Sequence, residues 1–106
     1  MDNFKVMYRI LRYLEQAMDY SEPDMGAISP EQLRISPERW ERLMLMMQDD
    51  GYIKGIKVTQ SLADTHKRIA YPIYPTITIK GLEFLEENSL MKKAAALASG
   101  VVDVIK

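Results

Sequence analysis

The sequence predicts a small, mostly helical α+β fold, and the order of elements between residues 29 and 88 supports that prediction. Two Ser-Pro pairs, at Ser29 and Ser36, mark helix starts so close together that a tight turn must join the two helices. Two strand-like runs, 52–58 and 71–78, then flank a long basic excursion, and a further helix follows. This order is that of a winged helix-turn-helix, with a three-helix core, a two- to three-stranded β wing and, here, an extra C-terminal helix.

Length and composition indicate one globular domain. The chain has 106 residues, of which 47% are hydrophobic and 27% are charged, as is ordinary for a soluble protein with a modest core. No apolar run approaches the roughly 18 residues of a membrane span, and the N-terminus lacks the apolar region of a signal peptide. The absence of cysteine excludes a disulfide framework. We therefore expect a cytoplasmic protein that does not associate with membranes.

The net charge of −1 conceals a separation of charge along the chain. Residues 1–50 carry ten acids and six bases, whereas residues 51–80 carry five bases and a single acid, Asp64. The local field, rather than the total charge, governs the attraction of a polyanion. The basic segment therefore predicts either a nucleic-acid contact or a hairpin that its lysines keep soluble, and the sequence leaves both interpretations open.

Residues 3–19 are predicted to form the first helix, because apolar residues recur at helical spacing. One apolar face would serve the core: Phe4, Met7, Leu11, Leu14 and Met18. A second apolar side would need a further partner: Val6, Ile10, Tyr13 and Ala17. A turn-rich linker follows, and Met25–Ile28 is predicted to form a short edge strand.

Ser29 and Ser36 are each expected to cap a helix whose first position is proline. The second helix of this pair, at 37–49, would bury Trp40, Leu43, Met44 and Met47. Its opposite side carries Glu38, Arg42, Leu45 and Asp49, flanked by Arg39, Glu41 and Met46. In a DNA reader this side enters the major groove, so Arg39 and Arg42 are candidates for base or phosphate contact. The acids near the helix end would repel phosphates.

The two strand-like runs differ in pattern. In the first run, Ile56 and Val58 are expected on one face, and in the second, Ile73 and Ile77 alternate while two prolines restrict pairing to an edge. The tip between them, 59–70, is the predicted wing, which would follow phosphates or enter a minor groove. Its polar candidates are Gln60, Ser61, His66, Lys67 and Arg68.

A further helix is predicted from Thr78, its cap, to about residue 88, burying Leu82 and Leu85. Residues 89–106 carry an apolar stripe at helical spacing but are too short and too alanine-rich to be stable alone, so the stripe must dock. Its expected acceptor is the second apolar side of the first helix, either within one chain or across the two-fold axis of a homodimer. The predicted organisation is thus a winged helix domain at 1–88 and a C-terminal docking or dimerisation helix at 89–106.

The residue inventory argues against an enzyme. The chain has no cysteine nucleophile, and its single histidine, His66, has no acidic partner recognisable in the sequence. The spacing of Gly51 and Gly55 does not match a phosphate-binding loop, and no metal-ligand spacing stands out. We expect no catalytic activity, no cofactor and no metal.

Three stretches of the chain carry a resemblance to a known family: Tyr8-Arg-Ile-Leu-Arg-Tyr-Leu14, Asp49-Asp-Gly-Tyr-Ile-Lys-Gly55 and Thr76-Ile-Thr-Ile-Lys-Gly-Leu-Glu-Phe-Leu-Glu-Glu-Asn88. They resemble the YjcQ-like family of small winged-helix proteins from Gram-positive bacteria and their phages. The resemblance covers most of the chain and implies a winged helix in a bacterial, prophage or phage setting. It implies no activity and no site residues.

Two classes of function remain. The first is a DNA-binding transcriptional regulator whose wing lies on the phosphates of double-stranded DNA. Its candidate contacts are Arg39, Arg42, Gln48, Lys54, Lys57, Gln60, His66, Lys67 and Arg68. The second is a protein-interaction module in which Leu45 and Met46 are the contact residues. The basic wing favours the regulator, which rests partly on analogy of fold.

Overall fold

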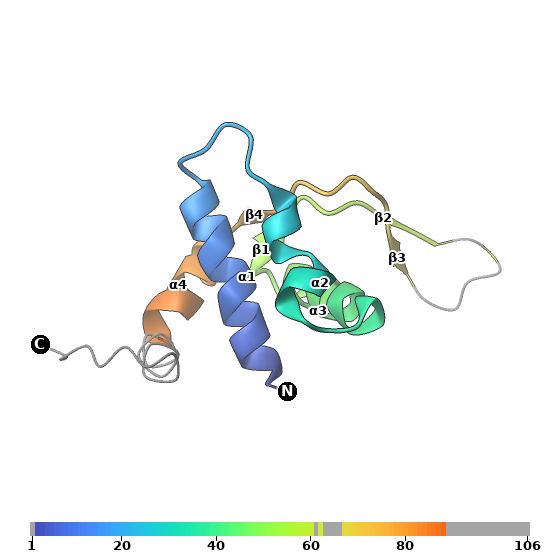
Figure 1. Cartoon of the computed structure of the whole chain (residues 1–106), viewed down its shortest axis with the longest axis horizontal. Helices are drawn as coiled ribbons and strands as arrows, with labels where there is room; N and C mark the ends of the chain where they lie inside the picture. The colour runs from blue at the N-terminus through green and yellow to red at the C-terminus, as the bar shows by residue number, and fades with distance from the viewer. Residues whose placement is uncertain (1, 61, 63–66, 89–106) are drawn as a thin grey trace, which may run out of the picture.

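The computed structural model describes residues 2–60, 62 and 67–88, which form an α+β domain of the winged-helix type. Its helices are α1 (Asn3–Ala17), the 3-10 helix η1 (Met25–Ile28), α2 (Pro30–Leu33), α3 (Pro37–Asp49) and α4 (Ile79–Glu87). Its strands are β1 (Ile53–Lys54), β2 (Val58–Thr59), β3 (Arg68–Ile69) and β4 (Thr76–Ile77). Helix α1 occupies the centre, between α4 and the α2–α3 pair, and β2 and β3 extend away from the helical body (Figure 1).

Side-chain hydroxyls begin three of these helices, as the sequence predicts. Ser29, Ser36 and Thr78 each accept a hydrogen bond from the backbone N–H three residues later, at 3.3, 3.1 and 3.1 Å. Arg34, with a φ of 59°, then ends α2 in the left-handed region and turns the chain towards α3. The predicted helix-turn-helix is therefore confirmed.

The predicted edge strand at Met25–Ile28 is wrong, because this segment is the 3-10 helix η1. The Asp24 carboxylate accepts a hydrogen bond from the Gly26 N–H at 2.9 Å. Two further bonds of i to i+3 type close the turn, from the Ala27 N–H to the Asp24 carbonyl and from the Ser29 N–H to the Gly26 carbonyl. These local bonds use backbone groups that a strand would offer to a sheet.

Helix α1 differs from its predicted division into a core face and an unpartnered side. Val6, Ile10 and Ala17 of the second side are buried, and α4, β4, η1 and α3 all contact the helix. Phe4 and Met18 of the first face are instead 58% and 65% exposed. Leu11 and Leu14 of the first face are buried, as predicted, so the predicted core face is wrong only at its ends. The predicted need of the second side for a partner outside the domain is wrong at the buried residues, because elements from several directions surround α1. The predicted contact with residues 89–106 lies outside the described residues.

Helix α3 packs as the sequence predicts. Trp40, Leu43, Met44 and Met47 are all buried, so one face of the helix lies in the core. The indole Nε1–H of Trp40 donates a hydrogen bond to the Ile28 carbonyl at 2.7 Å, which satisfies the one polar atom of that side chain. This bond fixes η1 against the inner face of α3.

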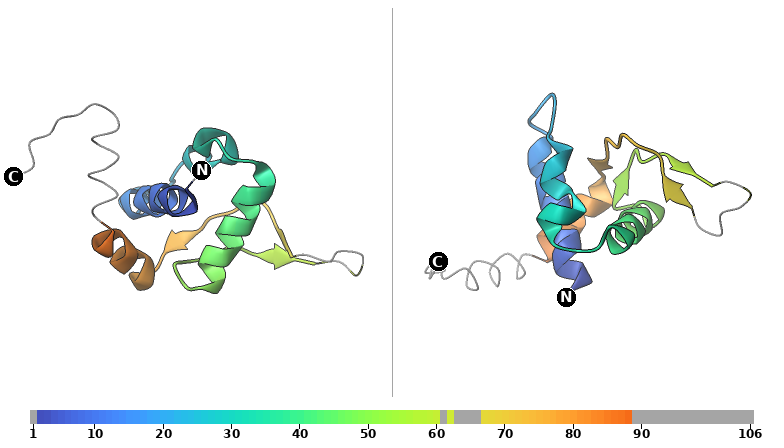
Figure 2. Two further views of the ribbon diagram at one scale, coloured as in Figure 1. Left: turned by 90° about the horizontal axis from the view of Figure 1, so that it is seen from below. Right: turned by 45° about the vertical axis from the view of Figure 1, so that its right-hand side comes forward.

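The strands form two antiparallel pairs, so the first predicted run, 52–58, is divided between β1 and the start of β2, and the second, 71–78, contains only β4. Strand β1 pairs with β4, with Ile53 opposite Ile77, and β2 pairs with β3, with Val58 opposite Ile69. The second pair is the wing, which projects beyond α3 in both views of Figure 2. Strand β3 lies within the stretch that the sequence predicts as an irregular tip.

Gly55 causes the interruption between β1 and β2. Its φ of 98° is a conformation that favours glycine, and an ideal Cβ there would lie 3.1 Å from the Tyr74 carbonyl oxygen. Side-chain alternation does not continue through this bend. Ile56 is buried while Val58 is 44% exposed, so their predicted placement on one face is wrong.

Helix α4 approaches the backbone after α3 closely at Gly81. An ideal Cβ at this glycine would lie 2.5 Å from the Tyr52 carbonyl oxygen and 2.6 Å from the Ile77 Cγ1. Leu82 and Leu85, which the sequence predicts as buried, are only half-buried, whereas Phe84 is buried.

No helix in the described part of the chain combines the length and apolarity needed to cross a bilayer.

Candidate nucleic-acid interface

An open groove lies between the outer face of α3 and the wing, and it encloses about 670 Å³. It is lined by Glu38, Glu41, Arg42, Leu45, Met46, Asp49, Gln60, Lys67 and Arg68. Six of these residues come from α3, and the other three come from the wing or its edge. Residues far apart in the sequence therefore form one surface.

The groove brings together several of the predicted contact residues. Arg42, Gln60, Lys67 and Arg68 all line it. The half-buried Leu45 and the 57% exposed Met46 line the same groove. The two classes of function that the sequence suggests thus converge on one site.

The remaining predicted contacts lie elsewhere. Lys54 in β1 and Lys57 between β1 and β2 are exposed but do not line the groove. Arg39 donates a hydrogen bond from its Nη1 to the Asn3 Oδ1 at 2.8 Å, which connects α3 with the start of α1. His66 and Ser61 lie outside the described residues.

Gln48 has a structural role that does not fit its predicted contact with bases. Its Nε2 donates to the Ile56 carbonyl at 2.8 Å, and its Oε1 accepts from the Ile56 N–H at 2.8 Å. The amide therefore satisfies both backbone groups of Ile56, in the bend between β1 and β2. This pair of hydrogen bonds resembles the pair that two opposite residues form in an antiparallel sheet, and it holds the base of the wing to α3.

Glu41 attaches the other strand of the wing to α3, and sequence reasoning missed it. Its Oε1 accepts from the Arg68 Nε at 3.0 Å, and its Oε2 accepts from the Ile69 N–H at 2.9 Å. The carboxylate side chain is only 17% exposed, whereas the Arg68 side chain is 62% exposed. Because 27 residues separate Glu41 from Arg68, no local sequence pattern indicates the pair.

The charged side chains that line the groove are balanced in number. Its described lining carries as many carboxylates (Glu38, Glu41, Asp49) as cations (Arg42, Lys67, Arg68). The Arg68 charge is partly balanced by Glu41, so Arg42 and Lys67 supply the cations that have no ion pair among the described residues. Attraction of a polyanion therefore depends mainly on these two and on the exposed lysines of the β1–β2 segment.

The pKa of Tyr71 depends on the charged side chains at the base of the wing. Partial burial raises the pKa of its phenol above the usual value, the Glu41 carboxylate raises it further, and Arg68 opposes both effects.

Within the described residues, no group of three or more His, Cys, Asp or Glu side chains is placed to hold a metal ion.

The helix-turn-helix, the antiparallel wing and the groove between them define a winged-helix protein with a groove of mixed charge. The model of the YjcQ protein family matches residues 8–104, so the chain belongs to the YjcQ family. Neither a curated protein nor a solved structure matches the chain.

Proposed function

We propose that this protein binds double-stranded DNA through α3 and the wing and acts as a small transcriptional regulator in a bacterial, prophage or phage setting. The observation that carries the proposal is the groove, because it places Arg42 of α3 beside Lys67 and Arg68 of the wing. In the winged-helix arrangement, the second helix of the helix-turn-helix enters the major groove while neighbouring segments contact phosphates.

The distribution of charge supports this orientation. The segment 51–80 has five bases against one acid, and Lys54, Lys57 and Lys67 are exposed on or beside the wing. The acids of α3 weaken a purely electrostatic attraction, since Glu38 and Asp49 line the same groove. We therefore expect the affinity for a random duplex to be low at physiological salt. Most of the electrostatic attraction should come from the cations of the wing.

Fluorescence anisotropy with a labelled mixed-sequence duplex at low salt tests this proposal. Arg42→Ala and Lys67→Ala should each weaken binding about fivefold to tenfold, because each removes one phosphate or base contact of about 1 kcal/mol. The matched control is Lys5→Ala, an exposed lysine of α1 that does not line the groove, and it should leave the affinity unchanged. Equal losses in all three variants, or no binding by the unaltered protein, would refute the proposal.

A second candidate function is the recognition of a protein partner through the same groove. The specific observation is that Leu45 and the 57% exposed Met46 lie among its acids. Met46→Lys separates the two functions, because an added cation strengthens a DNA contact but places a charge in an apolar protein contact. Tighter duplex binding by Met46→Lys supports DNA, whereas unchanged duplex binding favours the protein partner.

A further inference from the structure

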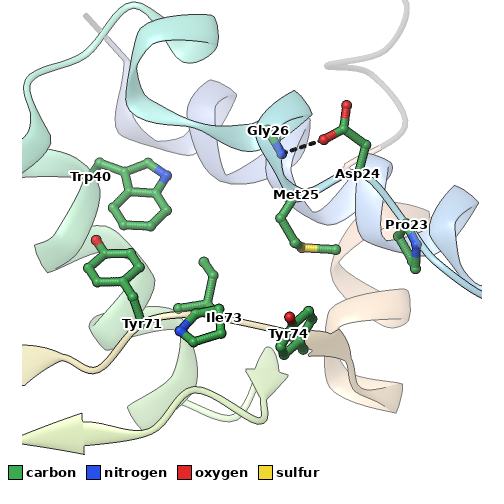
Figure 3. Close-up of a pocket in the computed structure, with 9 residues that line it drawn as sticks. Pro23, Asp24, Met25, Gly26, Trp40, Tyr71, Ile73 and Tyr74 are labelled. Atoms are coloured by element: carbon green, nitrogen blue, oxygen red, sulfur yellow. Dashed lines mark hydrogen bonds between the residues drawn. The ribbon is translucent and has the colours of Figure 1, made fainter.

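A second hollow, of about 730 Å³, lies between the segment that leads into η1 and the segment that follows β3. It is lined by Pro23, Asp24, Met25, Gly26, Trp40, Tyr71, Pro72, Ile73 and Tyr74. Figure 3 shows Met25 approaching from η1 on one side and the two tyrosines on the other. We refer to it as the aromatic groove.

Aromatic rings and prolines make up most of the lining of this groove, and two of its three aromatic side chains are exposed. Tyr71 and Tyr74 are 65% and 69% exposed. Tyr71 stacks on the buried Trp40, with ring centroids 6.4 Å apart and planes inclined by 11°. Because Trp40 is itself fixed by its bond to the Ile28 carbonyl, Tyr71 rests on a rigid support.

The groove has one charge. Asp24 is the only residue among those that line it whose side chain is charged at neutral pH. Its Oδ1 accepts the Gly26 N–H at 2.9 Å, while its Oδ2 has no hydrogen-bond partner among the described residues. An occupant with a cation would complement this carboxylate, and a polyanion would be repelled by it.

We propose that the aromatic groove binds a proline-containing, positively charged segment of a partner protein. Proline-rich segments hold a preformed extended helix whose rings fit between exposed aromatic side chains, so they bind such grooves at a low cost in conformational entropy. A lysine or arginine in the segment pairs with Asp24. The tyrosine hydroxyls are available to donate to the backbone carbonyls that such a helix leaves unbonded.

A second copy of the chain is a poor occupant for this groove. The chain has five prolines, and each is followed or preceded by acids or by uncharged residues rather than by a lysine or arginine. Pro23, for example, lies between Glu22 and Asp24. None of the five prolines thus offers the adjacent cation that Asp24 would complement, so we take the partner to be another protein. This inference does not depend on DNA binding, since the aromatic groove shares no lining residue with the groove between α3 and the wing.

The test uses a synthetic peptide of repeated prolines with one central arginine, titrated into the full-length protein. Trp40 is the only tryptophan of the chain, so its fluorescence reports the groove directly, and amide chemical shifts identify the residues involved. We expect a saturable change in fluorescence, with shifts at the lining residues. A control peptide with alanine in place of each proline should produce neither.

Single substitutions test whether the peptide contacts the side chains that line the aromatic groove. Tyr74→Ala should weaken binding at least about tenfold, as the loss of an aromatic anchor does. Tyr20→Ala is the matched control, because Tyr20 is 63% exposed but does not line the groove. Asp24→Asn retains the oxygen that accepts the Gly26 N–H, so it should weaken the arginine peptide severalfold and leave an all-proline peptide unaffected.

Three outcomes would overturn the proposal. The first is no saturable response up to about 1 mM peptide, the weak limit of useful recognition. The second is binding that Tyr74→Ala leaves intact or that Tyr20→Ala reduces equally. The third is a dimer in light scattering that Tyr74→Ala converts to a monomer, which would place a second copy of the chain in the groove.

Discussion

Gly81→Ala is a sharp test of the packing between α4 and the segment after α3. Helix propensity alone predicts a gain, because alanine is more favourable than glycine by about 1 kcal/mol inside a helix. The close approach predicts a loss. The new Cβ would lie 2.5 Å from the Tyr52 carbonyl oxygen and 2.6 Å from the Ile77 Cγ1, and real Cβ atoms essentially never come so close.

The magnitude follows from what must move. Ile77 is a side chain of the buried core, and the Tyr52 carbonyl is a backbone group that accepts the Thr78 N–H at 3.2 Å. Displacing both costs about 3 kcal/mol from overpacking, with up to about 1 kcal/mol more from the weakened hydrogen bond. After the gain in propensity, we expect a net loss of about 2–3 kcal/mol, or a fall in Tm of roughly 10–20 °C.

Thermal and urea unfolding monitored by circular dichroism measure this loss. Glu83→Ala is the control, since Glu83 is exposed on the same helix and its replacement should change stability by less than about 0.5 kcal/mol. A Gly81→Ala protein as stable as the unaltered one would refute the described contact of α4 with the Tyr52 carbonyl and with Ile77 of β4.

Two other substitutions test the attachment of the wing to α3. Gln48→Ala leaves the Ile56 N–H and carbonyl without their partners, so we expect a loss of about 2 kcal/mol in urea unfolding, and a loss below about 0.5 kcal/mol would contradict this role. Glu41→Gln retains an acceptor for the Ile69 N–H but removes the negative charge that disfavours the Tyr71 phenolate, so the pKa of Tyr71 should fall in a spectrophotometric titration. Because the folded-state pKa of Tyr71 is raised, its contribution to stability is complete below its unfolded pKa of about 10 and is lost as the pH rises through the folded value. An unchanged Tyr71 titration in Glu41→Gln would contradict the described proximity.

Local chemistry made much of the fold predictable from the sequence. The Ser-Pro pairs specify helix starts because serine satisfies a free N–H and proline suits the first helical position. The periodicity of 37–49 correctly selects the buried face of α3. These signals act within a few residues, so no knowledge of tertiary contacts was needed.

Features that depend on distant contacts could not be predicted in this way. The periodicity of α1 indicates apolar sides but not which neighbours cover them. It therefore places Phe4 in the core, where it is instead exposed, and it does not show that the fold itself covers Val6. The strand pattern of 52–58 gives no sign that Gly55 adopts a positive φ. Glu41 is one acid among several on α3, and only the fold brings it to Arg68.

The salt dependence of duplex binding tests the central functional claim most directly. If the wing and α3 together contact three or four phosphates, log affinity should fall against log salt with a slope of about −3. Replacing Arg42 and Lys67 together by alanine should reduce the magnitude of that slope by about two, since these are the groove cations without an ion pair among the described residues. A slope that the double variant leaves unchanged, or no detectable binding at low salt, would contradict a DNA-binding role for this groove.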